Sequence, residues 1–276
     1  MVRALEREIT EFGVTTTVLI NDQDTYDPAT LTLDRREVAA SIDAELAAET
    51  KWRHYLDPEK SRMSMWGQVQ LRRAYRRMRL RPPSRSTRPP IAGAKALRRL
   101  INIELSHLSL MRQAVDDGAE WVLIVEDDSY LEDPKAFANS LAIFMREHAL
   151  ASQPKYLNVS RSFDHNTLGI DHLFTDAGRW GQNPEIAILS ADRPVTNTVC
   201  AILYRGTFLS ELLIELESIP IAPVLPIDWK LNVALMNMHN HRTIGAGDCW
   251  SLVPAPVIQR SMHRESNQLS EGNKGG

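Results

Sequence analysis

One stretch limits the fold of this chain more than any other: the five consecutive apolar residues from Trp121 to Val125 (WVLIV). Five apolar residues without alternation are typical of a central strand that is covered on both faces. Before this run, apolar residues recur every three or four positions, as in an amphipathic helix, and Asp116-Asp117-Gly118 ends the pattern. These helical positions are Leu97, Ile101, Leu105, Leu108, Met111 and Val115. A helix that feeds a buried strand predicts a layered α/β fold.

Other segments show apolar patterns that are typical of a strand or of a helix. The β-branched run Val14 to Ile20 (VTTTVLI) predicts a first buried strand, which ends in a polar cluster at Asn21 and Asp22. Helical spacing from Asp34 to about Tyr55 predicts a helix with Asp34 as its N-cap. Further strands are predicted at 155–160, 185–190 and 196–204, and further helices at 134–148, 206–218 and 228–238.

The composition bounds the class of protein. With 276 residues, 43% of them hydrophobic and 24% charged, the chain resembles an average globular protein and not a collagen-like, disordered or disulfide-stapled one. Its two cysteines, Cys200 and Cys249, form no CxxC pair, which favours a reducing compartment. The first thirteen residues hold no apolar signal core, and no apolar run is long enough to cross a bilayer. We therefore expect a cytoplasmic protein without a transmembrane segment.

Basic residues are concentrated in one region. Residues 71–103 contain eleven Arg and Lys and no Asp or Glu, which leaves 21 basic against 35 acidic residues elsewhere, a balance of −14. We expect a single domain over residues 1–265 with an Arg/Pro-rich insertion at about 72–90, and a flexible tail at 266–276. The basic segment has three interpretations: a solvated surface, a contact with anionic lipid at the membrane periphery, or a binding surface for a polyanionic acceptor such as nucleic acid.

The sharpest chemical feature is the acidic triplet Glu126-Asp127-Asp128 at the end of the apolar run. Ligands of open α/β sheets bind beyond the carboxyl ends of strands, and clustered carboxylates repel each other unless a positive charge joins them. Mg²⁺ or Mn²⁺ suits such oxygen ligands and often bridges to a diphosphate. The alternative is a solvated acidic turn before the helix that starts at Pro134.

The stretch Glu104 to Leu110 (ELSHLSL), a spacer that ends in Gly118, and then Trp121 to Asp128 (WVLIVEDD) together resemble the helix–strand signature of glycosyltransferase family 25. That family comprises lipooligosaccharide galactosyltransferase-like enzymes. Two later blocks are similar to the family in order and spacing, namely Thr198 to Gly206 (TVCAILYRG) and Pro226 to Trp229 (PIDW). The resemblance covers about residues 94–135 and 196–262 well, whereas Ile20 to Gln23 only echoes the family's opening turn.

The resemblance implies a GT-A fold, a Rossmann-like sandwich with a mostly parallel central sheet, in which acidic residues hold a metal and a nucleotide-diphosphate sugar. It implies that Asp128 binds the metal directly, and that Glu126 and Asp127 hydrogen-bond the ribose, coordinated waters or donor sugar. Asn21 and Asp22 correspond to the opening turn and would contact the nucleotide.

Asp228 is the second acidic candidate. It follows the proline-rich segment from Pro220 to Pro226 and opens a predicted helix. As a general base it would remove the proton of an acceptor hydroxyl that attacks the anomeric carbon, and a single displacement would invert that centre. Alternatively, Asp228 is a helix N-cap or holds acceptor hydroxyls.

Histidines supply the remaining candidates. His107, within the striped helix, is either a buried histidine bonded to a backbone carbonyl or a residue that orients the acidic turn or the diphosphate. His263 is either a third metal ligand or phosphate donor, or an exposed residue near the tail. The pair His239 and His241 favours a solvated loop, because HxH spacing alone is weak evidence for a metal.

The sequence therefore predicts a metal-dependent, inverting glycosyltransferase that uses Mn²⁺ or Mg²⁺ and a nucleotide-diphosphate sugar. Its acceptor would be a hydroxyl of a glycan or of a polyanion, such as a lipid-linked glycan or nucleic acid. Two other classes stay open: a nucleic-acid-binding or nucleic-acid-modifying protein built on the basic segment, and a metal-dependent phosphotransferase or nuclease. A Walker-type glycine loop and a second tight acidic cluster are not evident in the sequence.

Overall fold

The computed structural model describes residues 2–15, 17, 19, 35–57, 66–67, 70–74, 91–161, 170–181, 183–195, 199–219 and 227–259. The proposed tail and nearly all of the proposed insertion lie outside these residues. Within the described part of the chain, no helix combines the length and apolar character that a membrane span needs.

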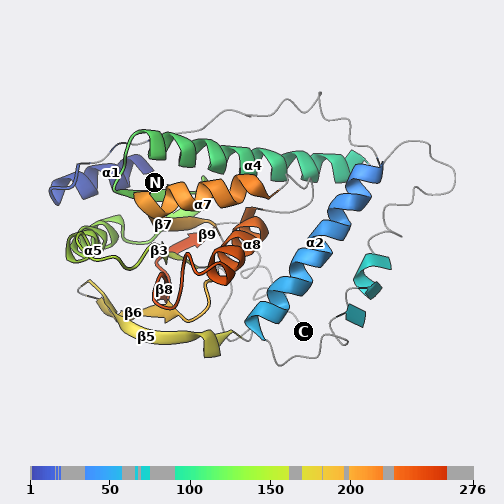
Figure 1. The fold of residues 1–276 in the computed structure, drawn as a ribbon. Helices are drawn as coiled ribbons and strands as arrows, with labels where there is room; N and C mark the ends of the chain where they lie inside the picture. The colour runs from blue at the N-terminus through green and yellow to red at the C-terminus, as the bar shows by residue number, and fades with distance from the viewer. Residues whose placement is uncertain are drawn as a thin grey trace, which may run out of the picture.

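Six strands form the main sheet, in the order β1-β7-β3-β8-β6-β5. Their bounds are β1 Trp121–Val125, β3 Tyr156–Asn158, β5 Phe174–Trp180, β6 Asn183–Ala191, β7 Ala201–Arg205 and β8 Cys249–Val253. A second sheet has the order β2-β9-β4, with β2 Ser129–Leu131, β4 Ser160–Arg161 and β9 Val257–Gln259. Helices lie on both sides of the main sheet (Figure 1), so the fold class is α/β, as predicted.

The expectation of a mostly parallel central sheet is wrong. Only the β3–β8 pair is parallel in the six-stranded sheet, and the other four neighbouring pairs are antiparallel. Because β7 is antiparallel to both β1 and β3, β1 and β3 run in the same direction with β7 between them. An apolar run indicates that both faces of a strand are covered by helices. This coverage is the same whether the neighbouring strand is parallel or antiparallel, so the run does not predict strand direction.

Two apolar clusters fill the space between the sheet and its helices. Ile202 and Tyr204 of β7 belong to the cluster with α4 (Ile91–Asp116), α7 (Gly206–Ser218) and α8 (Ile227–Asn240). Ala201 and Leu203 point the other way, into the cluster with α1 (Val2–Glu11) and α5 (Pro134–Glu147). Successive side chains of a strand point to opposite faces, so this single strand contributes to both clusters. Figure 1 shows α4 and α7 together on one side of the sheet.

Four of the predicted helices are confirmed within two residues at each end, namely α2 (Arg35–Leu56), α5, α7 and α8. The fifth, α4, is confirmed but begins at Ile91, six residues before the first position of the predicted stripe, Leu97. The N-cap assigned to Asp34 lies outside the described residues. Asp133 instead caps α5, where its carboxylate accepts a 2.9 Å hydrogen bond from the Ala136 N–H and Pro134 occupies the first turn.

The first buried strand expected at Val14 to Ile20 is not found in the described residues of that segment. Residues 14, 15, 17 and 19 carry no strand, although Val14 and Leu19 pack against the two apolar clusters. Both side chains are half-buried, whereas Thr15 and Thr17 are exposed. The expectation of a buried strand is therefore not met in the described residues of this segment.

Strand directions bring several chain segments to one edge of the main sheet. The carboxyl ends of β1, β3 and β8 lie at the same edge as the amino end of β7. The small sheet begins there too, since β2 follows β1 and β4 follows β3. Residues that leave or enter these strands therefore meet at this edge, where ligands of α/β sheets commonly bind.

Candidate active site

The acidic triplet forms a tight turn at this edge. The Glu126 N–H donates to the Cys200 carbonyl over 2.8 Å, and the Ser129 N–H donates back to the Glu126 carbonyl over 3.1 Å. The turn divides the three acids: Glu126 and Asp128 are half-buried, whereas Asp127 is exposed. The side chains of Glu126 and Asp128 thus face the protein, whereas the side chain of Asp127 faces away from it.

Three donor side chains converge at the turn. One ligand atom each of Glu126, Asp128 and Cys200 lies within 4.8 Å of the other two. Donor atoms that share one cation, each at roughly 2.0–2.3 Å from it, lie at most about 4.5 Å apart, so small side-chain movements would bring these three together. The two carboxylates are ligands that suit Mn²⁺ or Mg²⁺, and these two donors therefore fit the cation that the sequence predicts.

Two side chains flank the carboxylate of Glu126. His107 Nε2, on α4, lies 3.5 Å from Glu126 Oε1, close enough for an ion pair when the imidazole is protonated. Gln259 Nε2, on β9, donates to Glu126 Oε2 over 3.3 Å. His107 is buried, with 6% of its surface exposed. The structure thus places His107 against the acidic turn, and its role in orienting this turn stays a prediction.

Ser129 links the turn to Cys200. The Ser129 hydroxyl donates to the Cys200 carbonyl over 3.1 Å and lies 2.9 Å from the Cys200 sulfur. The pKa of the Cys200 thiol is raised to about 12, chiefly by burial, while the Ser129 hydroxyl lowers it and the charges of Glu126 and Asp128 raise it. Without a cation beside it, this thiol therefore keeps its proton at neutral pH.

Asp228 lies in the first turn of α8, one residue inside the helix, and so it is not the N-cap. Its Oδ1 accepts a 2.8 Å hydrogen bond from the Trp229 N–H, one of the N–H groups that a helix start leaves without a helical partner. Burial raises the pKa of Asp228, the Trp229 and Asp228 N–H groups lower it, and the charge of Glu126 raises it. Asp228 and Glu126 are thus close enough to sense each other's charge.

A buried ion pair joins the helices that carry these groups. Lys230 of α8 donates from Nζ to Glu104 Oε1 of α4, and the two side chains are 1% and 2% exposed. Glu104 precedes His107 by one helical turn, and Lys230 follows Asp228 by two residues. The pair therefore ties the helix start at Asp228 to the helix face that contacts the acidic turn.

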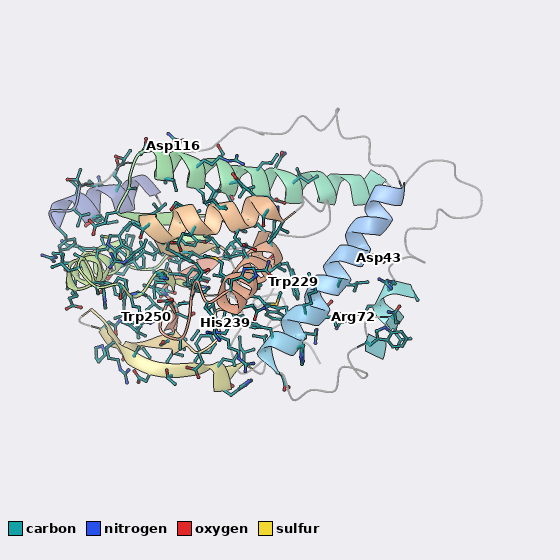
Figure 2. All side chains as sticks on the ribbon, viewed as in Figure 1. Asp43, Arg72, Asp116, Trp229, His239 and Trp250 are labelled. Carbon is teal, nitrogen blue, oxygen red and sulfur yellow. The ribbon has the colours of Figure 1, made fainter. Side chains whose placement is uncertain are left out.

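Aromatic side chains lie beside Asp228. Trp229 contacts Trp52 of α2 edge to face, with ring centroids 5.1 Å apart, and Figure 2 shows Trp229 between α8 and α2. Near the other end of α8, the His239 ring lies 5.3 Å from that of Tyr55. His239 is part of the helix, which corrects the expectation of a solvated loop there, while His241 lies exposed in the following turn.

Two arginines of the basic segment pair with acids of α2. Arg72 pairs with Glu49, and Arg73 donates from Nε to Asp43 Oδ1 over 2.9 Å. Figure 2 shows Arg72 and Asp43 where residues 70–74 lie beside α2. These two arginines are bound to acids of the same chain, which favours the surface interpretation for this part of the segment.

Three of the predicted site residues cannot be placed. Asn21, Asp22 and His263 lie outside the described residues. Sequence reasoning missed four residues that lie in the candidate site or in the ion pair behind it, namely Cys200, Gln259, Glu104 and Lys230. Glu104 has a signal in the sequence, because it is three positions before His107 and so shares its helix face.

Comparisons with known proteins add no family assignment. The chain matches no protein-family model and no curated protein sequence. Its functional interpretation therefore depends on the site itself.

Proposed function

We propose that this chain is a metal-dependent glycosyltransferase that moves a sugar from a nucleotide-diphosphate donor to a hydroxyl of an acceptor, with inversion at the anomeric carbon. One observation carries the proposal. Glu126 and Asp128 converge at the edge of the main sheet where β1 ends, and the charge of Glu126 raises the pKa of a third, separate carboxylate, Asp228. The reaction needs both parts, namely a charged site for the leaving diphosphate and a base for the nucleophile.

The first part is the cation site. Glu126 and Asp128 would hold Mn²⁺ or Mg²⁺, and the bound cation would supply the positive charge that stabilises the departing diphosphate. His107 and Gln259 contact the two oxygens of Glu126 and restrict its rotation. Residues that orient a metal ligand in this way strengthen binding by fixing the ligand before the cation arrives.

The second part is the base. Asp228 would accept the proton of the acceptor hydroxyl while that oxygen attacks the anomeric carbon. Burial raises the pKa of Asp228, and a carboxylate with a raised pKa is a stronger base than an exposed one. The ion pair of Lys230 with Glu104 would hold the start of α8 in place during the reaction.

The acceptor is part of the same proposal. A glycan hydroxyl is the simplest acceptor, and a lipid-linked glycan would place this cytoplasmic enzyme at the periphery of a membrane. The alternative of a nucleic-acid-binding protein receives less support, since Arg72 and Arg73 are already paired with acids of α2.

The test is a thermal-shift panel of nucleoside diphosphates, each with and without Mn²⁺. We expect one nucleotide to stabilise the protein only when the metal is present, by about 2.7 kcal/mol at 100 times its dissociation constant. Asp128→Asn should abolish this stabilisation, because a ligand charge is lost while the side-chain volume is kept.

Asp176→Asn is the control, since Asp176 is an exposed acid on β5, at the opposite end of the strand order from β1. It should retain the metal-dependent stabilisation. Stabilisation that survives in Asp128→Asn, or that disappears equally in both variants, would contradict the assignment of the cation site.

A further inference from the structure

The third donor in the candidate cation site is a sulfur atom. The Cys200 side chain comes from the segment before β7, whereas Glu126 and Asp128 come from the turn after β1. Two separate parts of the chain therefore direct three different donor groups at one point. Cys200 has no exposed surface, so its sulfur faces protein groups and the two carboxylates and not bulk solvent.

The backbone keeps this sulfur in place relative to the carboxylates. The Cys200 carbonyl accepts hydrogen bonds from the Glu126 N–H over 2.8 Å and from the Ser129 hydroxyl over 3.1 Å. The next residue, Ala201, pairs with Val125 in the sheet register. The position of the sulfur is thus set by the same contacts that set the acidic turn.

Ser129 supports the sulfur from the side. Its hydroxyl lies 2.9 Å from Sγ and is buried, with 1% of Ser129 exposed. The Ser129 hydroxyl has a single proton, which can donate either to the Cys200 carbonyl or to Sγ. Turned toward Sγ, it would donate to a metal-bound thiolate, and hydrogen bonds of this kind orient ligands and tune their affinity. The immediate surroundings of Cys200 are therefore compatible with a thiolate as well as with a thiol.

Building on the proposed function, we propose that Cys200 Sγ is the third protein ligand of the cation held by Glu126 and Asp128, and that it makes the site prefer Mn²⁺, Co²⁺ or Zn²⁺ to Mg²⁺. On binding, the S–H bond breaks, the proton leaves to the buffer, and a sulfur–cation bond forms without any change in oxidation state.

The preference follows from ligand chemistry. Thiolate is a soft ligand that binds first-row transition ions well and Mg²⁺ poorly, whereas carboxylates accept both kinds of cation. With two carboxylates alone, Mg²⁺ would suffice. One sulfur in the set shifts the selectivity, and the order of affinity should follow the transition series, with Mn²⁺ below Co²⁺.

The experiment titrates the metal-free chain with Co²⁺ and records its absorption spectrum. A thiolate ligand produces a sulfur-to-cobalt charge-transfer band in the near ultraviolet. We expect this band in the wild type and in Cys249→Ser, which removes the other buried cysteine of the chain. Because the chain has only these two cysteines, the band in Cys249→Ser assigns the ligand to Cys200 even if Cys200→Ser folds poorly.

Cys200→Ser should lose the band and bind Co²⁺ at least about tenfold more weakly. Mg²⁺ should displace Co²⁺ from the wild type only at an excess of roughly 100-fold or more. Asp128→Asn should weaken Co²⁺ binding as well, which places the sulfur and the carboxylate in one site.

Binding of Co²⁺ that depends on Asp128 but shows no charge-transfer band would overturn the role of Cys200 and leave the proposed function standing. Retention of the band in Cys200→Ser, or its loss in Cys249→Ser, would also overturn it. If the wild type binds none of the four cations in the presence or absence of nucleotide, both this inference and the proposed function fail.

Discussion

At the scale of single residues, the base is the sharpest test of the proposed reaction. Asp228→Asn keeps the shape of the side chain and a hydrogen-bond acceptor for the Trp229 N–H, but it removes the group that takes the proton. We expect the rate constant for sugar transfer to fall about 10²- to 10⁴-fold. Single-turnover transfer at saturating donor measures this change directly.

Donor binding should persist in the same variant, since Asp228 is separate from the cation ligands. Asp176→Asn is a suitable control, because Asp176 is an exposed acid on β5 whose partner is Arg179. Its transfer rate should equal that of the wild type. If Asp228→Asn instead weakens metal-dependent nucleotide binding as strongly as it slows transfer, Asp228 belongs to the nucleotide site.

The residue scale also shows which parts of the site the sequence could predict. Glu126, Asp128 and Asp228 are acids next to clear element boundaries, and chemistry alone marks them as candidates. The exposure of Asp127 depends on the turn geometry, which the triplet does not encode by itself. Cys200 and Gln259 reach the turn only through the pairings of β7 and β9, and such long-range pairings leave no local pattern.

At the scale of elements, the ion pair between α4 and α8 has a measurable cost when it is broken. Glu104→Gln would leave the buried Lys230 without its counter-charge, and removal of one partner of such a pair destabilises a protein by about 3–5 kcal/mol. Urea denaturation followed by tryptophan fluorescence measures the free energy of unfolding.

The double variant Glu104→Leu with Lys230→Met separates the charge from the packing. Apolar residues of similar volume often replace a buried ion pair at little cost, so the double variant should be more stable than Glu104→Gln. If the double variant is no better than the single one, the two side chains stabilise the helices through packing and not through their charges.

The start of α7 depends on a close backbone approach. A Cβ at Gly206 would lie 1.8 Å from the Ala119 carbonyl oxygen, and the Gly206 N–H donates to the Glu120 carbonyl over 2.8 Å. We expect Gly206→Ala to destabilise the protein by at least about 1–3 kcal/mol, since the clash is with backbone that cannot rotate away.

Gly245 offers the matched control, because a Cβ there meets nothing within 4 Å. Gly245→Ala should change the melting temperature little, whereas Gly206→Ala should lower it by several degrees. Equal melting temperatures for the two variants would show that the junction between β7 and α7 adjusts without cost.

Helices could be predicted better than strands in this chain. A helix satisfies its own hydrogen bonds, so its apolar spacing and its caps are local, as the Asp133 cap of α5 illustrates. Strand β5 escaped prediction because Asp176 and Gly178 are poor strand residues, and its pairing with β6 shifts register between them. Strand β8 (CWSLV) is short and is stabilised by neighbours from distant parts of the chain.

At the scale of the whole molecule, the direction of the strands could not be deduced from the apolar runs. Val122 and Ile124 of β1 face one cluster, while Leu123 and Val125 face the other. The run Trp121 to Val125 therefore packs on both faces, although only Ile124 is buried and the other four residues are half-buried. The expectation of a central strand is wrong, because β1 is the last strand in the order of the described sheet. Both-sided burial and strand direction are separate properties, and only the first has a sequence signature.

The stability of the molecule should also depend on pH through His148 at the end of α5. Its ring packs 4.5 Å from Phe144 and 5.2 Å from Trp250, between centroids. Burial lowers the pKa of His148, hydrogen bonding to the Gln153 backbone and the charge of Glu147 raise it, and Arg205 lowers it, with a net shift below the ordinary value of 6.5. The folded protein therefore disfavours the imidazolium that the unfolded chain forms readily.

The sign of the effect follows from this difference. Well above pH 6.5 the imidazole is neutral in both states, and the free energy of unfolding does not depend on it. As the pH falls below 6.5, the unfolded chain binds the proton first, so the folded state loses stability until the lower, folded-state pKa is passed. Urea denaturation of the wild type and of His148→Gln between about pH 5.5 and 8 should give a smaller loss of stability in the variant.

Burial and the charge of Arg193 also lower the pKa of His239, so the double variant with His239→Gln should lose still less stability as the pH falls. An unchanged pH dependence in His148→Gln would show that the ring of His148 can take up a proton in the folded protein as easily as in the unfolded chain.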